Sequence, residues 1–173
     1  MTVAYTSYKA SATFAALTML SGSATFRTLV GAATPTLALA KIVEEWGGTP
    51  KLAGGEGKAI ASDNSAFTAT PPYAIVRVPE IQTELIGVGF YRYHGEVDIL
   101  VFQARKLTGE TPPESMRRAT NIADAIRDEI TAQFGATSCF ATGSCSIIGP
   151  GLPDDAGADA DALQAHLTIT FEG

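Results

Sequence analysis

The sequence has few of the side chains from which catalytic and metal sites are built. It contains two cysteines and two histidines in 173 residues, and no GxSxG, HExxH, CxxC or P-loop pattern occurs in it. A zinc site would have to be assembled from scattered residues, so we expect no enzyme, no cofactor and no metal. One alternative stays open, because His94 and His166 fall on polar faces of expected strands and could meet as a metal or acid–base pair.

Cysteine is also too scarce for a disulfide framework. Cys139 and Cys145 lie six positions apart around a glycine, so a bridge between them is sterically possible. Two cysteines do not form the dense framework of a small secreted domain. We interpret both as free, structural thiols.

Basic residues and long apolar runs are in short supply as well. Lys and Arg number 12 against 18 Asp and Glu, a formal net charge of −6, which argues against a protein that grips DNA phosphates. No run approaches the roughly 20 apolar residues of a membrane span, and the N-terminus lacks the apolar core of a signal peptide. We expect a soluble protein that is made and kept in a cytoplasm.

The length fits a single domain over residues 1–173. Residues 1–10 are expected to form a flexible arm, and residues 47–72 a long Gly-rich loop. Such long loops inside a compact domain are uncommon and are either functional or disordered. Their glycines and single apolar residues suit a segment that is ordered by, or contacts, neighbouring subunits.

The N-terminal segment is predicted to be helical. Apolar residues recur at helical spacing over residues 12–20, a second short turn covers residues 24–30, and Thr34-Pro35 starts a third. Ile42 to Trp46 then alternates in the manner of a short strand, although a continued helix is the alternative.

Residues 91–104 predict one long strand around which the chain is organised. One face is apolar or aromatic: Tyr91, Tyr93, Val97, Ile99 and Val101. The other is polar at Arg92, His94, Glu96 and Asp98 and becomes apolar at Leu100 and Phe102. We expect the helix over residues 113–134 to cover this second face from Leu100 onward.

Further strands are expected at residues 73–78, 146–149 and 163–171, with the first antiparallel to the long strand and residues 80–90 as a connection. Residues 113–134 predict an amphipathic helix that begins after Thr111 and ends at Gly135. Its apolar stripe is Met116, Ala119, Ile122, Ala123, Ile126, Ile130 and Phe134. The sequence therefore predicts an α+β fold, in which this helix covers an antiparallel sheet of about four to five strands.

Two charged motifs remain. Asp154 and Asp155 open the segment DDAGADAD, whose glycine and acidic positions do not fit the EF-hand calcium pattern, so we interpret it as a solvated acidic loop. Arg117 and Arg118 lie on the expected helix with acidic residues nearby. We interpret this pair as a salt-bridging or interfacial surface.

The order of these parts resembles a known family. PPYAIVRV, RYHGEVDILVFQA, ESMRRATNIADAIRDEI, GPGLPDDAG and LQAHLTITFE follow one another as in the tail terminator (tail completion) proteins of long-tailed bacteriophages. ATFRTLVGAATPTLALAKI is also similar to the start of small phage neck and tail proteins. The resemblance covers residues 14–172 except the loop 47–72.

The resemblance implies a virion protein, assembled in the bacterial cytoplasm, with no catalytic residues. Such proteins form a ring, usually a hexamer, that caps the tail tube and joins it to the head connector. DNA would pass through the lumen without specific binding. The candidates for channel-lining or subunit-interface positions are His94, Glu96, Asp98, Asp154, Asp155, Trp46, Arg117 and Arg118. A head–tail adaptor or tail tube subunit is the alternative, and a small metal-binding enzyme is a more distant one.

Overall fold

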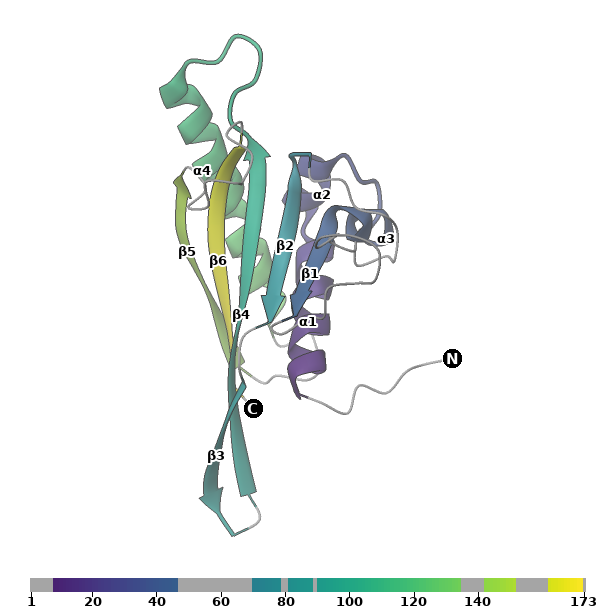
Figure 1. The fold of residues 1–173 in the computed structure, drawn as a ribbon, viewed down its shortest axis with the longest axis vertical. Helices are drawn as coiled ribbons and strands as arrows, with labels where there is room; N and C mark the ends of the chain where they lie inside the picture. The colour runs from purple at the N-terminus through teal and green to yellow at the C-terminus, as the bar shows by residue number, and fades with distance from the viewer. Residues whose placement is uncertain are drawn as a thin grey trace, which may run out of the picture.

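The computed structural model describes residues 8–46, 70–78, 81–88, 90–134, 142–151 and 162–172. These residues form an α+β fold, as predicted, with helices gathered on one side of a sheet (Figure 1). The N-terminal part is helical before its first strand: α1 (Tyr8–Gly22), α2 (Ala24–Val30), α3 (Pro35–Ala38), a 3-10 turn (Leu39–Lys41) and β1 (Ile42–Trp46). The remaining elements are β2 (Tyr73–Val78), β3 (Ile81–Gly87), β4 (Phe90–Ala104), α4 (Pro112–Thr131), β5 (Thr142–Gly151) and β6 (Ala162–Glu172).

The strands pair in the order β1-β2-β4-β6-β5, and β3 pairs with β4 off this path. The predicted antiparallel pair of β2 with β4 is confirmed, with Ala74 opposite Val101. The sheet is mixed, however, because β1 runs parallel to β2, with Ile42 opposite Ala74. A parallel pair needs a crossover of a dozen or more residues, and the chain between Trp46 and Tyr73 is long enough to supply it.

β3 corrects the expectation that residues 80–90 only connect two strands. It pairs antiparallel with the start of β4, with Thr83 opposite Tyr93 and Leu85 opposite Tyr91. The ladder is irregular between Leu85 and Gly87. Glycine in a strand weakens the sequence pattern and marks such irregularities, which is why this strand was missed.

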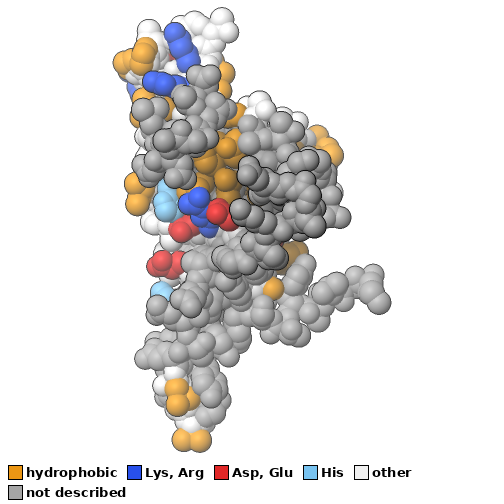
Figure 2. Space-filling model, in the orientation of Figure 1, with side chains coloured by type: hydrophobic (Ala, Val, Ile, Leu, Met, Phe, Trp, Pro, Cys, Tyr) orange, Lys and Arg blue, Asp and Glu red, His pale blue; other side chains and the backbone are white. Residues whose placement is uncertain are grey.

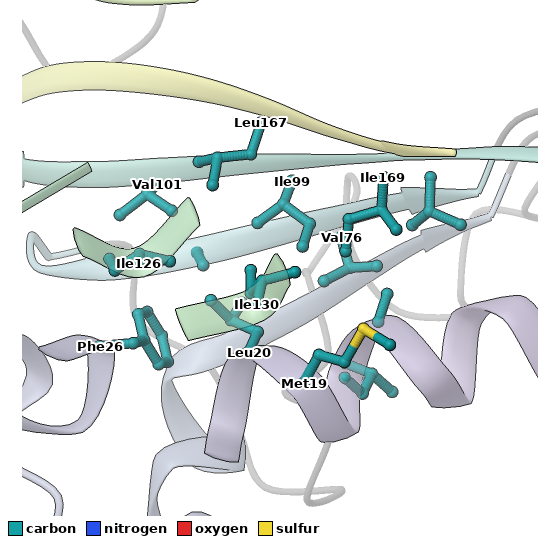
Figure 3. Close-up of a cluster of buried hydrophobic side chains, with 14 of the residues drawn as sticks. Met19, Leu20, Phe26, Val76, Ile99, Val101, Ile126, Ile130, Leu167 and Ile169 are labelled. Atoms are coloured by element: carbon teal, nitrogen blue, oxygen red, sulfur yellow. The ribbon is translucent and has the colours of Figure 1, made fainter. Parts of the chain in front are cut away.

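The main core lies between one face of the sheet and helices α1, α2 and α4 (Figure 3). Met19 and Leu20 of α1, Phe26 of α2, and Ile126 and Ile130 of α4 meet apolar side chains of the sheet that include Val76, Ile99, Val101, Leu167 and Ile169. Alternation along β6 is as predicted, with Leu163, Ala165, Leu167, Ile169 and Phe171 buried. The helix α4 therefore covers the sheet, as expected from its periodicity.

Two details of that packing differ from the prediction. Met116 was placed in the buried stripe but is 39% exposed, because the helix extends past the sheet at its N-terminal end (Figure 1). Leu100 and Phe102 lie on the sheet face away from α4, since side chains alternate along a strand and Ile99 and Val101 face the helix. They form a second, smaller buried cluster with Tyr73 and Ala162.

The termini of the helices are held by side chains. Thr111 and Glu114 form a reciprocal capping box at the start of α4. Ser23 caps α2 by accepting a hydrogen bond from the Phe26 amide, and its hydroxyl donates to Glu129 Oε2 at 2.6 Å. Glu129 therefore ties the start of α2 to the end of α4.

Candidate functional site

The face of the sheet opposite the helices, called here the far face, carries a polar row. The register places Glu45, Arg77, Asp98 and Thr168 directly opposite one another across β1, β2, β4 and β6. Arg77 Nε donates to Glu45 Oε2 at 2.6 Å, and Thr168 Oγ1 donates to Asp98 Oδ1 at 2.9 Å. Figure 2 shows acidic, basic and histidine side chains gathered midway along this face, beside hydrophobic ones.

The two histidines do not meet. His166 Nε2 lies 2.9 Å from Asp98 Oδ1, whereas His94 is in register with Glu172 and is exposed. His166 stands opposite Leu100, so six residues of β4 separate the two positions, or about 20 Å at roughly 3.3 Å per residue. The alternative of a histidine pair is therefore wrong. Within the described ranges, no three His, Cys, Asp or Glu side chains lie close enough together to hold a metal ion.

The predicted interface residues that the structure describes are dispersed along the molecule. Glu96 is exposed on β4, and Asp98 is half-buried beside His166. Trp46 is the last residue of β1, opposite Val78. Asp154 and Asp155 lie outside the described residues, as does Cys139. Cys145 on β5 is a free thiol, and burial raises its pKa to about 11.

A two-stranded arm extends from one end of the molecule (Figure 1). It consists of β3 and the start of β4, residues 81–88 and 90–93, because β6 ends at Glu172 opposite His94 and β2 pairs with β4 only as far as Asp98. Leu85 is 62% exposed and Val88, at the turn, is fully exposed. A two-stranded hairpin is marginally stable by itself in water. Contact with another surface would therefore stabilise the arm.

The opposite end of the molecule is formed by residues 105–117, called here the corner, where β4 passes into α4 (Figure 1). Its exposed side chains include three basic and two large apolar ones: Arg105, Lys106, Leu107, Met116 and Arg117. Glu114 is the exposed carboxylate among them. Figure 2 shows basic and hydrophobic side chains together at this end.

The interior of the corner is held by Glu110 and Arg118. Arg118 Nε donates to Glu110 Oε1 at 2.7 Å, and both side chains are more than four-fifths buried. Glu110 Oε2 also accepts from the Leu107 amide and the Ser115 hydroxyl, each at 2.9 Å. Chiefly through the Arg118 hydrogen bond, and then that of Leu107, the pKa of Glu110 is lowered to about 2.

The predicted arginine pair therefore divides between two roles. Arg118 is an internal ion-pair partner that also donates to the Ala104 carbonyl at 2.8 Å, while Arg117 points outward. The role of Glu110 was not predicted. The signal for the corner is nevertheless present in the sequence, because four of the twelve Lys and Arg residues fall within residues 105–118.

No known protein-family profile matches this sequence, and no curated protein matches it either. None of the helices in the described part of the chain is both long and apolar enough to span a bilayer.

Proposed function

We propose that this protein is a structural component of a phage tail or neck, and specifically a tail terminator that forms a ring on the tail tube and joins it to the head connector. The observation that carries the proposal is the arm. It projects beyond its own core and exposes Leu85 and Val88 at its end. In a ring of identical subunits, every arm would contact the same surface of the next subunit, because closed cyclic symmetry repeats one interface.

The far face supports the same proposal. Arg77 and Glu45 form an ion pair on it, and Asp98 accepts a hydrogen bond from Thr168 beside His166. Together with the net charge of −6, this is a surface past which DNA would move without being held. Glu96 on β4, and the acidic loop at residues 154–161, are the proposed channel positions.

The test is the mass and shape of the purified protein. Size-exclusion chromatography with light scattering should give a single closed oligomer, and electron microscopy should show rings. Long tubes would favour a tail tube subunit, because tube subunits stack without limit. A chain that stays monomeric in the presence of tail tubes and connectors would contradict the proposal.

A further inference from the structure

We propose that the corner is a docking surface for an acidic protein surface that carries exposed apolar side chains. Given the proposed ring, that surface belongs to the next ring along the particle axis, so this inference rests on the proposed function. It adds which end of the subunit makes the axial contact, and which side chains form it.

The first support is charge. Residues 105–118 contain four cations and two carboxylates, a net charge of +2, so with −6 for the whole chain the remainder carries −8. Glu110 is paired internally with Arg118, whereas Glu114 is exposed and accepts hydrogen bonds from the Thr111 amide and hydroxyl. The exposed cations Arg105, Lys106 and Arg117 therefore outnumber the one exposed carboxylate. The corner is therefore a local basic surface on an acidic protein, and opposite charge is what favours encounter with a partner.

The second support is the apolar component. Leu107 is 48% exposed and Met116 is 39% exposed, and they accompany Lys106 and Arg117 on the corner. Nucleic-acid backbones are bound mainly by neutralising phosphates, for which exposed leucine and methionine offer little. Protein interfaces combine apolar contacts at their centre with charged groups at the rim. The corner has the composition of a protein contact, and methionine and arginine are among the residue types enriched in interfaces.

The third support is preorganisation. Glu110 joins the loop, through the Leu107 amide, to α4 through Ser115 and Arg118. Arg118 is held in turn by the Ala104 carbonyl, and Gln103 donates to the Ala119 carbonyl at 3.2 Å. A loop that is already fixed in its binding geometry loses less conformational entropy when a partner docks. The outward basic and apolar side chains are therefore displayed on a rigid base.

Location is the fourth support. The corner and the arm are at opposite ends of the long axis of the molecule (Figure 1). If the arms join neighbours within a ring, the corner remains available at the other end of every subunit. A ring would then present a circle of identical basic and apolar corners, and many weak contacts acting together produce strong attachment.

The experiment measures ring formation and docking separately. Rings of the wild-type chain are mixed with tail tubes that lack this protein, and in parallel with connector complexes, and binding is followed by co-sedimentation at low and raised salt. The double variant Lys106→Gln/Arg117→Gln, together with each of its single variants, is compared with Arg127→Gln, which removes one positive charge from the same helix as Arg117, ten residues further from the corner. We expect the double variant to bind its axial partner about tenfold more weakly and with less salt dependence, while Arg127→Gln binds like the wild type.

Two further binding measurements distinguish the kinds of contact. Leu107→Ser should weaken docking without changing its salt dependence, because it removes an apolar contact and no charge. In the second measurement, a short DNA duplex replaces the protein partners. Duplex binding that depends on Lys106 and Arg117 would overturn the proposal in favour of a nucleic-acid contact.

The remaining outcomes separate the two proposals. If the rings of all variants dock equally well, or dock to neither partner, the proposed docking surface is contradicted and the proposed ring is not. A chain that remains monomeric overturns both.

Discussion

Arg118 and Glu110, eight residues apart in the chain, meet at 2.7 Å in a largely buried position where β4 turns into α4. The carboxylate of Glu110 accepts hydrogen bonds from the guanidinium, the Leu107 amide and the Ser115 hydroxyl. The pair therefore determines how the corner is displayed, although neither side chain is part of its outer surface.

Replacing Glu110 by Gln should destabilise the protein in a pH-dependent way. The pKa of Glu110 is lowered from 4.5 to about 2 in the folded protein, so its ionised form stabilises the fold above the unfolded-state value. That stabilisation is lost as the pH falls from about 4.5 to about 2. The difference in unfolding free energy between wild type and Glu110→Gln should be largest near pH 7 and shrink toward pH 2. Urea titrations at a series of pH values measure it.

The control for this series is Glu96→Gln, a substitution of an exposed carboxylate on β4. We expect it to leave the unfolding free energy close to that of the wild type near pH 7. A difference for Glu110→Gln that stays constant from pH 7 to pH 2 would contradict the assigned role of its ionised form.

Changes at the tip of the arm should affect assembly and spare the fold. Leu85→Ser and Val88→Asp alter side chains that are already exposed, so each should change the unfolding free energy by no more than about 0.5 kcal/mol, as surface substitutions do. Light scattering should show loss of the oligomer. Leu37→Ser, at an exposed position on α3, is the matched control and should still assemble. Rings formed by both arm variants would remove the arm from the interface.

Gly143→Ala should destabilise the β5–β6 pair. A Cβ at this position would meet the Phe134 ring and would lie 2.6 Å from the Thr170 carbonyl oxygen. The backbone oxygen cannot rotate away as a side chain does, so the strand must shift. Overpacking of this kind costs about 1–3 kcal/mol, which a thermal or urea unfolding curve detects. Gly109→Ala would be a poor control because of its positive φ, so Ser144→Ala, at an exposed neighbouring position, serves instead. An unfolding curve for Gly143→Ala that matches that of Ser144→Ala would show that β5 adjusts freely.

Ser23→Ala should loosen the contact between α2 and α4. The substitution removes the N-cap of α2 and one of the hydrogen bonds to Glu129. Although burial alone would raise the pKa of Glu129, the hydrogen bonds from Ser23 and Thr25 lower it. We expect a loss of about 1–2 kcal/mol of unfolding free energy, at the upper end for an N-cap. Thr34→Ala, which removes the cap of the four-residue helix α3, should cost less, and equal losses would argue against a special role for Glu129.

Local periodicity made most elements predictable. The stripe of α4, the alternation of β6 and the strand at residues 73–78 are repeats of 3.6 or 2 residues whose apolar members favour burial. The same reasoning placed β1 at Ile42–Trp46 and started helices at Thr34 and Thr111, where proline and a capping side chain mark the boundary. These features depend on neighbours in the chain, so the sequence by itself determined them.

Tertiary structure alone decided how those elements meet. The parallel pairing of β1 with β2, the assignment of Leu100 and Phe102 to the face away from α4, and the separation of His94 from His166 all depend on strand order and register. A strand's alternation says which residues share a face, but the covering element is chosen by packing between distant segments. The burial of Glu110 against Arg118, which shapes the corner, likewise depends on contacts between the loop after β4 and the first turns of α4.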